Sequence, residues 1–295
     1  AEAFTEARQV FERIDDALDR KLSRLMFDGP DDELTLTENA QPALMAVSLA
    51  ICRVMADQGG IRPVTHVDFV AGHSLGEYSA LAAADALDLT VTAQLLRYRG
   101  QVMQDAVPVG EGAMAALIGA DVPFAIEIAE EASVGGAVCV LANDNAPGQV
   151  VISGHLQAIE RALAISAGRG VRKVMRLPVS GPFHSKLMTP ARKMMEEALA
   201  KVDIRHPVVP VVANVTARPV LDPDEIRAGL AKQITGQVRF RESVEYMRDA
   251  GVTEMVEIGA GKVLSPLVRR IDRGLSTRNL QTPDDIRAYI EEMNV

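Results

Sequence analysis

The chain has 295 residues, 48% of them apolar and 24% charged, so it can bury a core large enough for two domains or for one large domain with an insertion. Its 31 Lys and Arg residues against 40 Asp and Glu residues give a net charge of −9, which argues against nucleic acid as the main partner. The two cysteines, Cys52 and Cys139, both lie in apolar runs, which predicts reduced core thiols and excludes a disulfide-rich secreted scaffold. The sequence shows no membrane-length apolar stretch and no signal-peptide pattern, so we expect a soluble, cytoplasmic protein with no membrane partner.

The first 107 residues predict helices around one short strand. Apolar residues recur at spacings of three and four from Phe4 to Leu18, as in an amphipathic helix. Pro42 predicts the start of a second helix, whose apolar side chains cover most of its circumference, so we expect it to be buried against a sheet. The expected elements are helices over residues 4–18, 43–55, 77–86 and 90–105 and a strand over residues 66–71.

Residues 108–180 predict a compact inserted subdomain. Strands are expected over residues 114–119, 138–141, 149–153 and 172–177, and helices over residues 123–132 and 156–167, with a turn-rich segment at 143–148. This β-α-β-β-α-β order is that of a ferredoxin-like unit.

Strands and helices alternate again after the insertion. We expect a helix over residues 189–202, an apolar strand over 208–215, and a strand over 255–258 that runs through Gly259-Ala260-Gly261 into a helix. The pattern predicts an α/β protein with a mainly parallel sheet in a large domain formed by residues 1–107 and 181–295. Leu264 replaces the third glycine of a dinucleotide-binding motif and no metal-ligand spacing occurs, so neither NAD nor a metal is expected.

The segment Gly72-His73-Ser74-Leu75-Gly76 matches the pattern G-x-S-x-G between a predicted strand and a predicted helix. In this setting the serine sits on a strained turn that exposes its hydroxyl, and the next N–H can face an oxyanion. Ser74 is therefore a candidate nucleophile, with the Leu75 N–H as an oxyanion donor. The alternative is an ordinary turn in which Ser74 only caps the helix.

A serine nucleophile needs a base, and the chain offers five histidines. His73 is too close in sequence and would point away from the turn. His184 lies in an irregular segment rich in Pro and Gly, before a capped helix, and such loops often hold site residues. His184 is therefore the candidate base, and the alternative is an exposed loop histidine.

Arg99 leaves its predicted helix from the apolar side. Its neighbours three and four positions away are all apolar, namely Leu95, Leu96, Val102 and Met103. A guanidinium on a buried face needs a carboxylate partner. That partner is either an Asp or Glu of the protein or the carboxylate of a substrate, and the sequence leaves both open.

Several further stretches occur in the same order as in malonyl-CoA:acyl carrier protein transacylases, the acyltransferases that load malonate in fatty acid synthesis, and the chain resembles this family over nearly its whole length. These stretches are Gln41-Pro42-Ala43-Leu44, residues 72–81, Arg99-Gly100 with Met103-Gln104, residues 112–116, Asn143 to Gln149, Pro182-Phe183-His184-Ser185 and residues 259–264.

The resemblance implies an α/β-hydrolase-like large domain with an inserted ferredoxin-like subdomain. It also implies that Ser74 is the nucleophile, that His184 is its base and that Arg99 binds the malonyl carboxylate. Further substrate-binding residues are expected at Leu75, Gln41, Met103, Asn143 and Phe183. A backbone carbonyl near residues 236–239 is expected to orient the histidine, although Arg239 stands where the family commonly has Gln or Asn. The family begins with a strand and a Gly-Gln-Gly-Ser-Gln loop, which we expect this chain to lack.

The implied reaction is a ping-pong transfer of malonyl from malonyl-CoA to the phosphopantetheine thiol of acyl carrier protein, through malonyl-Ser74. The CoA thioester is a substrate, and no metal or redox cofactor is expected. Since acyl carrier proteins are acidic, a basic rim should receive them. The candidates are Lys186, Arg192, Lys193, Arg269 and Arg270.

Two other classes of function compete with this one. A serine esterase or thioesterase would share the turn around Ser74, but its order requires an acid and then a late histidine, and no histidine follows His206. A non-catalytic interaction module is the other alternative, favoured by the expected lack of the N-terminal loop.

Overall fold

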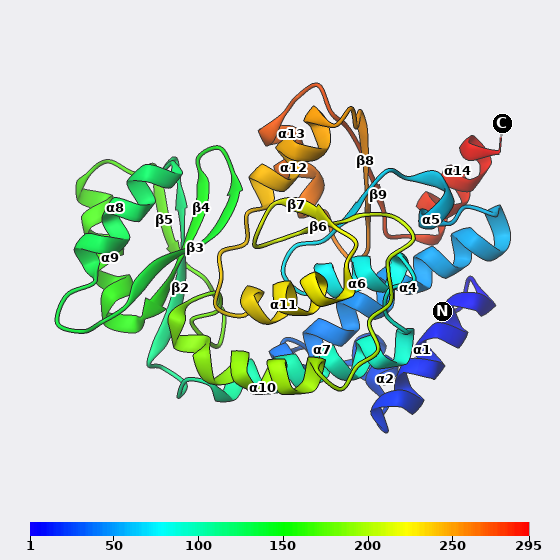
Figure 1. Cartoon of the computed structure of the whole chain (residues 1–295), viewed down its shortest axis with the longest axis horizontal. Coiled ribbons are helices and arrows are strands. Elements are labelled where there is room, and N and C mark those ends of the chain that lie inside the picture. The colour runs from blue at the N-terminus through cyan, green and yellow to red at the C-terminus, as the bar shows by residue number, and fades with distance from the viewer. Residues whose placement is uncertain (295) are drawn as a thin grey trace.

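The fold is described by a computed structural model that covers residues 1–294, without the side chains of Pro63 and Val64 (Figure 1). Its helices are α1 (Thr5–Leu18), α2 (Leu22–Asp28), α3 (Asp31–Leu34), α4 (Thr37–Gly59), α5 (Pro63–His66), α6 (Gly76–Ala83), α7 (Leu89–Asp105), α8 (Val122–Ala132), α9 (Leu156–Gly168), α10 (Thr189–Leu199), α11 (Pro223–Gln233), α12 (Phe240–Asp249), α13 (Leu264–Ile271) and α14 (Pro283–Met293), with a 3₁₀ turn at Lys186–Met188. Its strands are β1 (Val70–Ala71), β2 (Gly112–Ile118), β3 (Cys139–Ala146), β4 (Gln149–His155), β5 (Lys173–Arg176), β6 (Val211–Ala213), β7 (Arg218–Val220), β8 (Glu254–Ile258) and β9 (Ser276–Leu280).

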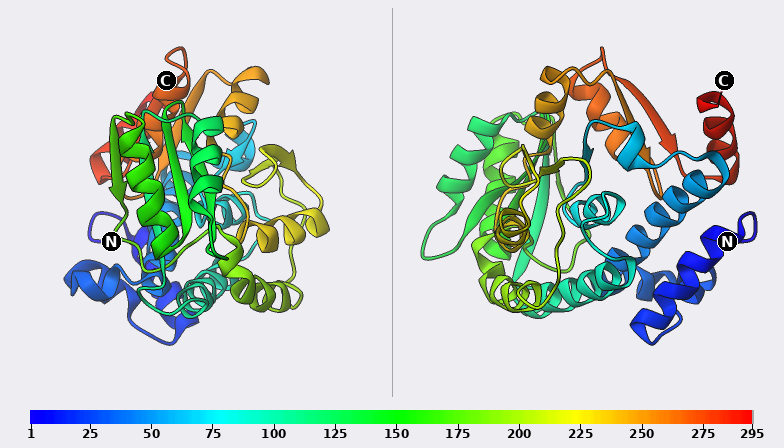
Figure 2. Two further views of the ribbon diagram at one scale, coloured as in Figure 1. Left: turned by 90° about the vertical axis from the view of Figure 1, so that its left-hand side faces the viewer. Right: turned by 45° about the vertical axis from the view of Figure 1, so that its right-hand side comes forward.

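An antiparallel sheet with the strand order β3-β4-β2-β5 forms one end of the molecule, on the left in Figure 1. Figure 2 shows α8 and α9 together on one face of this sheet. Successive side chains of β2 point to opposite faces of the sheet. Ala115 and Leu117 face the core under these helices, whereas Met114 and Ala116 belong to a separate cluster on the opposite face. Phe183 packs against that second cluster, so the sheet backs onto the segment that carries His184.

Strand β3 is longer than predicted and joins this sheet to the rest of the chain. The sequence predicts a turn-rich segment at 143–148, but β3 runs to Ala146 with two irregularities in its register. The extension is stabilised by Val238, whose N–H donates to Ala142 O at 2.8 Å and whose carbonyl accepts from Asp144 N at 2.9 Å. Backbone pairing with a segment almost a hundred residues away therefore overrides the local turn signals.

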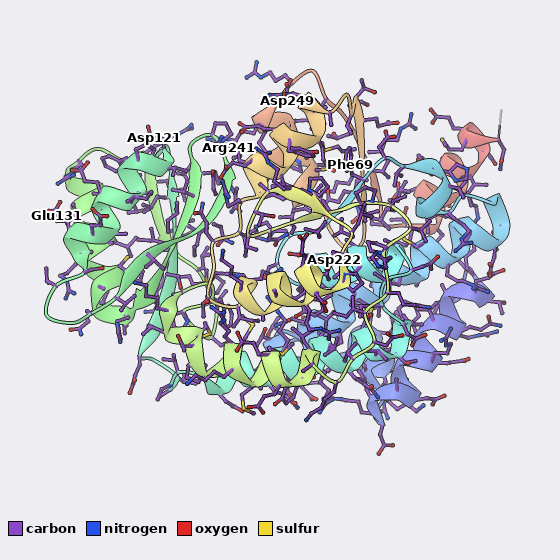
Figure 3. All side chains as sticks on the ribbon, viewed as in Figure 1. Phe69, Asp121, Glu131, Asp222, Arg241 and Asp249 are labelled. Carbon is purple, nitrogen blue, oxygen red and sulfur yellow. The ribbon has the colours of Figure 1, made fainter. Side chains whose placement is uncertain are left out.

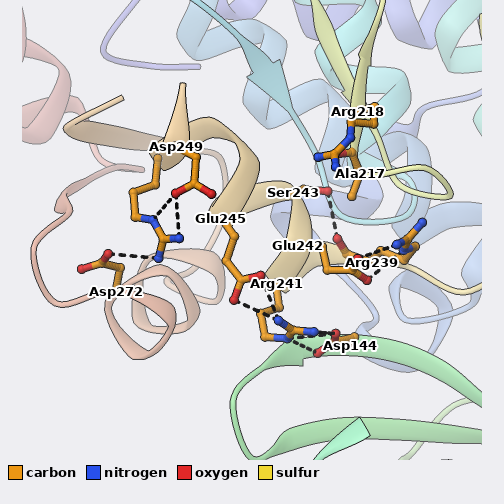
Figure 4. A network of polar contacts seen from close by, with 11 residues as sticks. Asp144, Ala217, Arg218, Arg239, Arg241, Glu242, Ser243, Glu245, Asp249 and Asp272 are labelled. Carbon is orange, nitrogen blue, oxygen red and sulfur yellow. Dashed lines mark hydrogen bonds and ion pairs between the residues drawn. The ribbon is translucent and has the colours of Figure 1, made fainter. Parts of the chain in front are cut away.

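Charged side chains reinforce the same junction (Figures 3 and 4). The guanidinium of Arg241, on α12, lies 2.8 Å from a carboxylate oxygen of Asp144 and 2.9 Å from one of Glu245. The Asp144 side chain is almost completely buried. Arg270, on α13, donates to the carbonyl of Pro147 at the tip of the β3–β4 hairpin.

The other strands form two small sheets. Strand β1 pairs with β6 in parallel and β6 with β7 antiparallel, while β8 and β9 form a parallel pair. The strand expected over residues 66–71 begins only at Val70, because Pro63–His66 forms a helical turn in which His66 Nδ1 lies 3.0 Å from Arg62 O. The strand expected over 208–215 is likewise confined to Val211–Ala213.

Helix α4 is the central helix of the large core, and it differs from its prediction in two ways. It begins at Thr37, so Pro42 lies inside the helix and not at its start. It packs chiefly on α1 and α7 and only slightly on a strand, so it is buried mainly by helices. By length and composition this helix could cross a membrane, but 61% of its most apolar window is buried within the fold, as expected for a core helix.

Gly100 allows α7 to approach the first turn of α4 closely. A Cβ atom at this position would lie 2.4 Å from Glu38 Cα, so no other residue fits without displacing α4. The close approach places Gln41 of α4 beside Arg99 of α7, where the two side chains form a hydrogen bond.

The two cysteines differ in environment. Cys139 is buried in the core of the small sheet, as predicted, whereas Cys52 is only partly buried at the edge of the large core. Burial raises the pKa of both thiols to about 12, so both are protonated at neutral pH.

Candidate active site

Ser74 lies on a sharp turn between β1 and α6, as the sequence pattern predicts. Its φ of +52° is in the left-handed region, which non-glycine residues seldom adopt. A Cβ atom on Gly72 would lie 2.0 Å from the backbone of Gly76, so the turn requires glycine there. Ser74 does not cap α6, because the N-cap residue is Leu75 and no side-chain cap forms. The strained turn instead leaves the serine hydroxyl free to contact other side chains.

His184 is hydrogen-bonded to this hydroxyl. Its Nε2 lies 2.9 Å from Ser74 Oγ, and its Nδ1 lies 2.9 Å from the carbonyl oxygen of Gln233. Since a carbonyl can only accept, the ring proton is assigned to Nδ1, which leaves Nε2 to accept from the serine. The side chain is 4% exposed, so the alternative of a solvent-exposed loop histidine is wrong.

The electrostatic surroundings keep this histidine neutral. Burial, and then the charge of Arg99, lower its pKa from 6.5 to about 3. At neutral pH the imidazole is therefore unprotonated and can take a proton from Ser74.

The depressed pKa of His184 predicts a loss of stability in acid. The imidazole of the unfolded chain is protonated below about pH 6.5, whereas the folded one stays neutral down to about pH 3. Its stabilising effect is thus complete above pH 6.5 and is lost as the pH falls toward 3, by about 1.4 kcal/mol per pH unit. We expect denaturant unfolding at about pH 7.5 and about pH 5 to show a larger loss for the wild type than for His184→Gln.

Comparing the wild type with His184→Gln isolates the contribution of His184 to the pH dependence of stability. Burial raises the pKa of Glu77 to about 7, so this carboxyl acts in the opposite direction, but it is present in both proteins. Equal losses in the two proteins would show that His184 titrates at its ordinary pKa in the folded state.

Arg99 is 1% exposed and is held by neutral groups. Its Nη1 donates to Gln41 Oε1 at 2.6 Å, and its Nη2 donates to Gln233 Oε1 at 2.8 Å and to Ser74 Oγ at 3.0 Å. Among the described side chains no carboxylate forms an ion pair with it, and its Nε has no hydrogen-bond partner. The alternative of a direct ion pair with an Asp or Glu of the protein therefore receives no support among the described residues. The charge of Glu77 acts on Arg99 only from a distance, and a positive charge remains next to the serine.

The other predicted binding residues are distributed around this centre. Gln41 contacts Arg99 directly, and the Leu75 N–H has no acceptor among the described residues. Phe183 is partly buried next to His184. Met103 is 2% exposed in the core beneath α7, and Asn143 is buried where its backbone pairs with Val238.

Three buried polar residues of the site were not predicted: Glu77, Asn214 and Gln233. The carbonyl that accepts the hydrogen bond from His184 Nδ1 belongs to Gln233, outside the expected segment 236–239, where Arg239 instead pairs with Glu242. Asn214 Oδ1 accepts from Ser74 N at 2.7 Å, and Asn214 Nδ2 donates to Gly72 O at 2.6 Å. A polar residue directly after an apolar strand was the available signal for Asn214.

The candidate basic residues do not form one surface. Lys186, Arg192 and Lys193 lie in or just before α10, whereas Arg269 and Arg270 lie on α13, and Figure 1 shows these two helices far apart. Arg192 pairs with Glu196, and Arg270 is bound to the hairpin described above.

The loop Gly259-Ala260-Gly261 has a structural role. The N–H groups of Val263, Leu264 and Ser265, at the start of α13, all donate to the carboxylate of Glu257. A phosphate would need the same N–H groups, so the chain itself occupies the position that a dinucleotide-binding loop keeps open.

Comparisons with known proteins agree with this geometry. Residues 3–280 match the family described as acyl transferase domain. The malonyl CoA-acyl carrier protein transacylase of Bacillus subtilis is 43% identical over 97% of this chain and 89% of its own length. The acyl-carrier-protein-S-malonyltransferase of Bartonella henselae is 51% identical, with a TM-score of 0.96 over 100% of this chain and 93% of that one. A malonyl-transacylase solved in complex with its type II PKS acyl-carrier protein is 38% identical, with a TM-score of 0.95 over 99% and 93% of the two chains.

Proposed function

Because the chain belongs to the acyl transferase domain family, and within it to the malonyl CoA-acyl carrier protein transacylases, we propose that it transfers malonyl groups from malonyl-CoA to acyl carrier protein in fatty acid synthesis. The observation that carries the proposal is one hydroxyl with two partners. Ser74 Oγ lies 2.9 Å from a neutral imidazole and 3.0 Å from a buried guanidinium. The first partner makes the hydroxyl a nucleophile, and the second selects an acyl group that carries its own carboxylate.

In the first half-reaction Ser74 Oγ attacks the thioester carbonyl of malonyl-CoA while His184 Nε2 takes the hydroxyl proton. The Leu75 N–H, at the start of α6, donates to the oxyanion that forms. The carbon–sulfur bond then breaks, His184 returns the proton to the departing CoA thiolate, and malonyl-Ser74 remains.

In the second half-reaction the phosphopantetheine thiol of acyl carrier protein attacks the serine ester. His184 takes the thiol proton and passes it to Ser74 Oγ as the ester bond breaks, which regenerates the hydroxyl. The transfer is therefore ping-pong. Its steps use only groups of this chain, the thioester of malonyl-CoA and the thiol of acyl carrier protein, so the proposal includes no metal or redox cofactor.

The fold assignment that accompanies this function is an α/β-hydrolase-like large domain and a ferredoxin-like small one. The small domain corresponds to residues 108–180, and the large one to residues 1–107 and 181–295. The element order β-α-β-β-α-β and the strand order β3-β4-β2-β5 support the assignment for the small domain. The turn at Ser74 between β1 and α6 supports it for the large one.

Mass spectrometry of the intact protein after incubation with malonyl-CoA tests the function. We expect a stable malonyl adduct that disappears when a phosphopantetheinylated acyl carrier protein is added, with malonyl appearing on the carrier. Release of free malonate without a carrier would indicate a thioesterase. The absence of both adduct and turnover would indicate a binding module.

A further inference from the structure

Glu77 is a buried carboxylate that the proposed mechanism does not use. It is the second residue of α6, directly behind the turn that carries Ser74, and it is 2% exposed. One of its oxygens, Oε2, accepts from Gln233 Nε2 at 2.7 Å and from the backbone N–H of Asn214 at 3.1 Å. It contacts none of the reacting atoms, but both of its partners do contact groups of the active site.

The first partner, Gln233, links four groups. Its side-chain Nε2 donates to Glu77 and to Ser74 O, its side-chain Oε1 accepts from Arg99 Nη2, and its backbone oxygen accepts from His184. An amide can bind in two orientations that exchange its oxygen with its NH₂ group. Only one of the two orientations forms all of the side-chain hydrogen bonds given above.

The carboxylate determines which orientation is adopted. If the Gln233 amide were reversed, its oxygen would face the Glu77 and Ser74 oxygens, and its NH₂ group would face the Arg99 guanidinium. The amide oxygen would then face two other acceptors, and the amide NH₂ group would face another donor, so these hydrogen bonds would be lost. Because Glu77 Oε2 already accepts from the Asn214 N–H, this oxygen carries no proton and can only accept from Gln233. Glu77 therefore holds the NH₂ group on its own side and the oxygen toward Arg99.

The second partner, Asn214, holds the backbone of the turn. Its N–H is bound by Glu77, its Oδ1 accepts from Ser74 N, and its Nδ2 donates to Gly72 O. The acceptor atom of Glu77 is therefore one hydrogen-bonded residue away from both the nucleophile and the guanidinium.

We propose that Glu77 is a positioning residue for substrate selection: by accepting from Gln233 and Asn214 it fixes the amide orientation that holds Arg99 in place for the carboxylate of the acyl group. The inference rests on the proposed function, since it assigns Arg99 to the malonyl group. The proposed role requires the acceptor oxygen of Glu77 within hydrogen-bond distance of Gln233 and Asn214, and not merely a negative charge nearby.

Two substitutions separate the position of the Glu77 acceptor oxygen from the charge of this side chain. Glu77→Gln keeps an oxygen that can accept both hydrogen bonds but removes the charge, whereas Glu77→Asp keeps the charge but withdraws the oxygen by one carbon–carbon bond. The readout is the ratio of kcat/KM for malonyl-CoA to kcat/KM for acetyl-CoA, because an acetyl group makes no use of Arg99. We expect Glu77→Asp to lower this ratio about tenfold or more, and Glu77→Gln to keep it within about threefold of the wild type.

A matched pair at Glu257 controls for general loss of stability. Glu257 also accepts several backbone N–H groups at a helix start, but it contacts none of the site residues, so neither Glu257→Asp nor Glu257→Gln should change the ratio. If Glu77→Asp does not fold, Glu77→Ala takes its place, because alanine lacks the acceptor oxygen altogether. A lower ratio in Glu77→Ala with a retained ratio in Glu77→Gln supports the proposal, and an unchanged ratio in Glu77→Ala or a lost preference in Glu77→Gln contradicts it.

Two results would overturn the inference. One is an unchanged ratio in a folded Glu77→Asp variant, and the other is a lower ratio in Glu77→Gln than in Glu77→Asp, which would assign the effect to charge. A wild type that transfers no malonyl at all would instead refute the proposed function, so the two failures are distinguishable.

Discussion

Replacing Ser74 with alanine is expected to abolish labelling of the protein by malonyl-CoA. The turn at Gly72 and Gly76 presents this one hydroxyl to His184, and the transfer requires a covalent ester at that oxygen. The side chain is not part of the core, so the variant should remain folded. Intact-protein mass spectrometry after incubation with malonyl-CoA measures the adduct.

Ser79→Ala, on helix α6 just after the turn, serves as the control and should label like the wild type. His184→Ala should still become labelled, but about 100-fold or more slowly, since the serine then lacks its general base. Labelling that persists in Ser74→Ala would place the nucleophile elsewhere, and an unchanged rate in His184→Ala would mean that another group accepts the proton.

Arg99→Ala is expected to shift the acyl preference from malonyl toward uncharged groups. The wild-type guanidinium is buried and has only neutral oxygens as partners among the described residues, so a malonyl carboxylate would complete its hydrogen bonding. A charge-assisted pair of this kind contributes about 1.5–3 kcal/mol, or about 10- to 150-fold in kcat/KM. We therefore expect malonyl-CoA to lose this factor while acetyl-CoA gains activity.

Arg97→Ala is the matched control, since Arg97 lies on the same helix and has the same charge but is partly exposed and is 3.9 Å from Glu38. It should leave the ratio of malonyl to acetyl transfer unchanged, and Arg99→Lys should retain only part of the preference because lysine lacks the planar fork. If both substrates lose activity equally in Arg99→Ala, the arginine has a structural role only.

The sequence predicted those parts of the fold and the site that depend on local patterns. The periodicity of α1, α7, α8 and α9 and the glycines around Ser74 are local features, and the structure confirms them to within a few residues. The contact of Arg99 with Ser74 could not be derived in this way, although the apolar neighbours of Arg99 indicated that it is buried.

Other parts of the fold depend on distant partners. The pairing of β3 with Val238 overrides the turn signals of residues 143–148, and the approach of Gly100 to Glu38 places the first turn of α4 ahead of Pro42. Helix α11, which carries Gln233, was missed although Asp222-Pro223 is a helix-start signal, and the role of this glutamine was missed with it. Its function arises from where the helix ends, which no local pattern encodes.

The hydrogen bonds that join Ser74 to His184 and Gln233 span 110 and 159 positions of the sequence. The intervening chain includes the whole four-stranded sheet, so no local stretch can assemble the reaction centre while the remainder is unfolded. Contacts of such long sequence separation carry a large loop-closure cost and form slowly. In a refolding experiment, recovered transfer activity would therefore report the docking of the segments that precede and follow the four-stranded sheet, whereas helix content would return with the local contacts that form first.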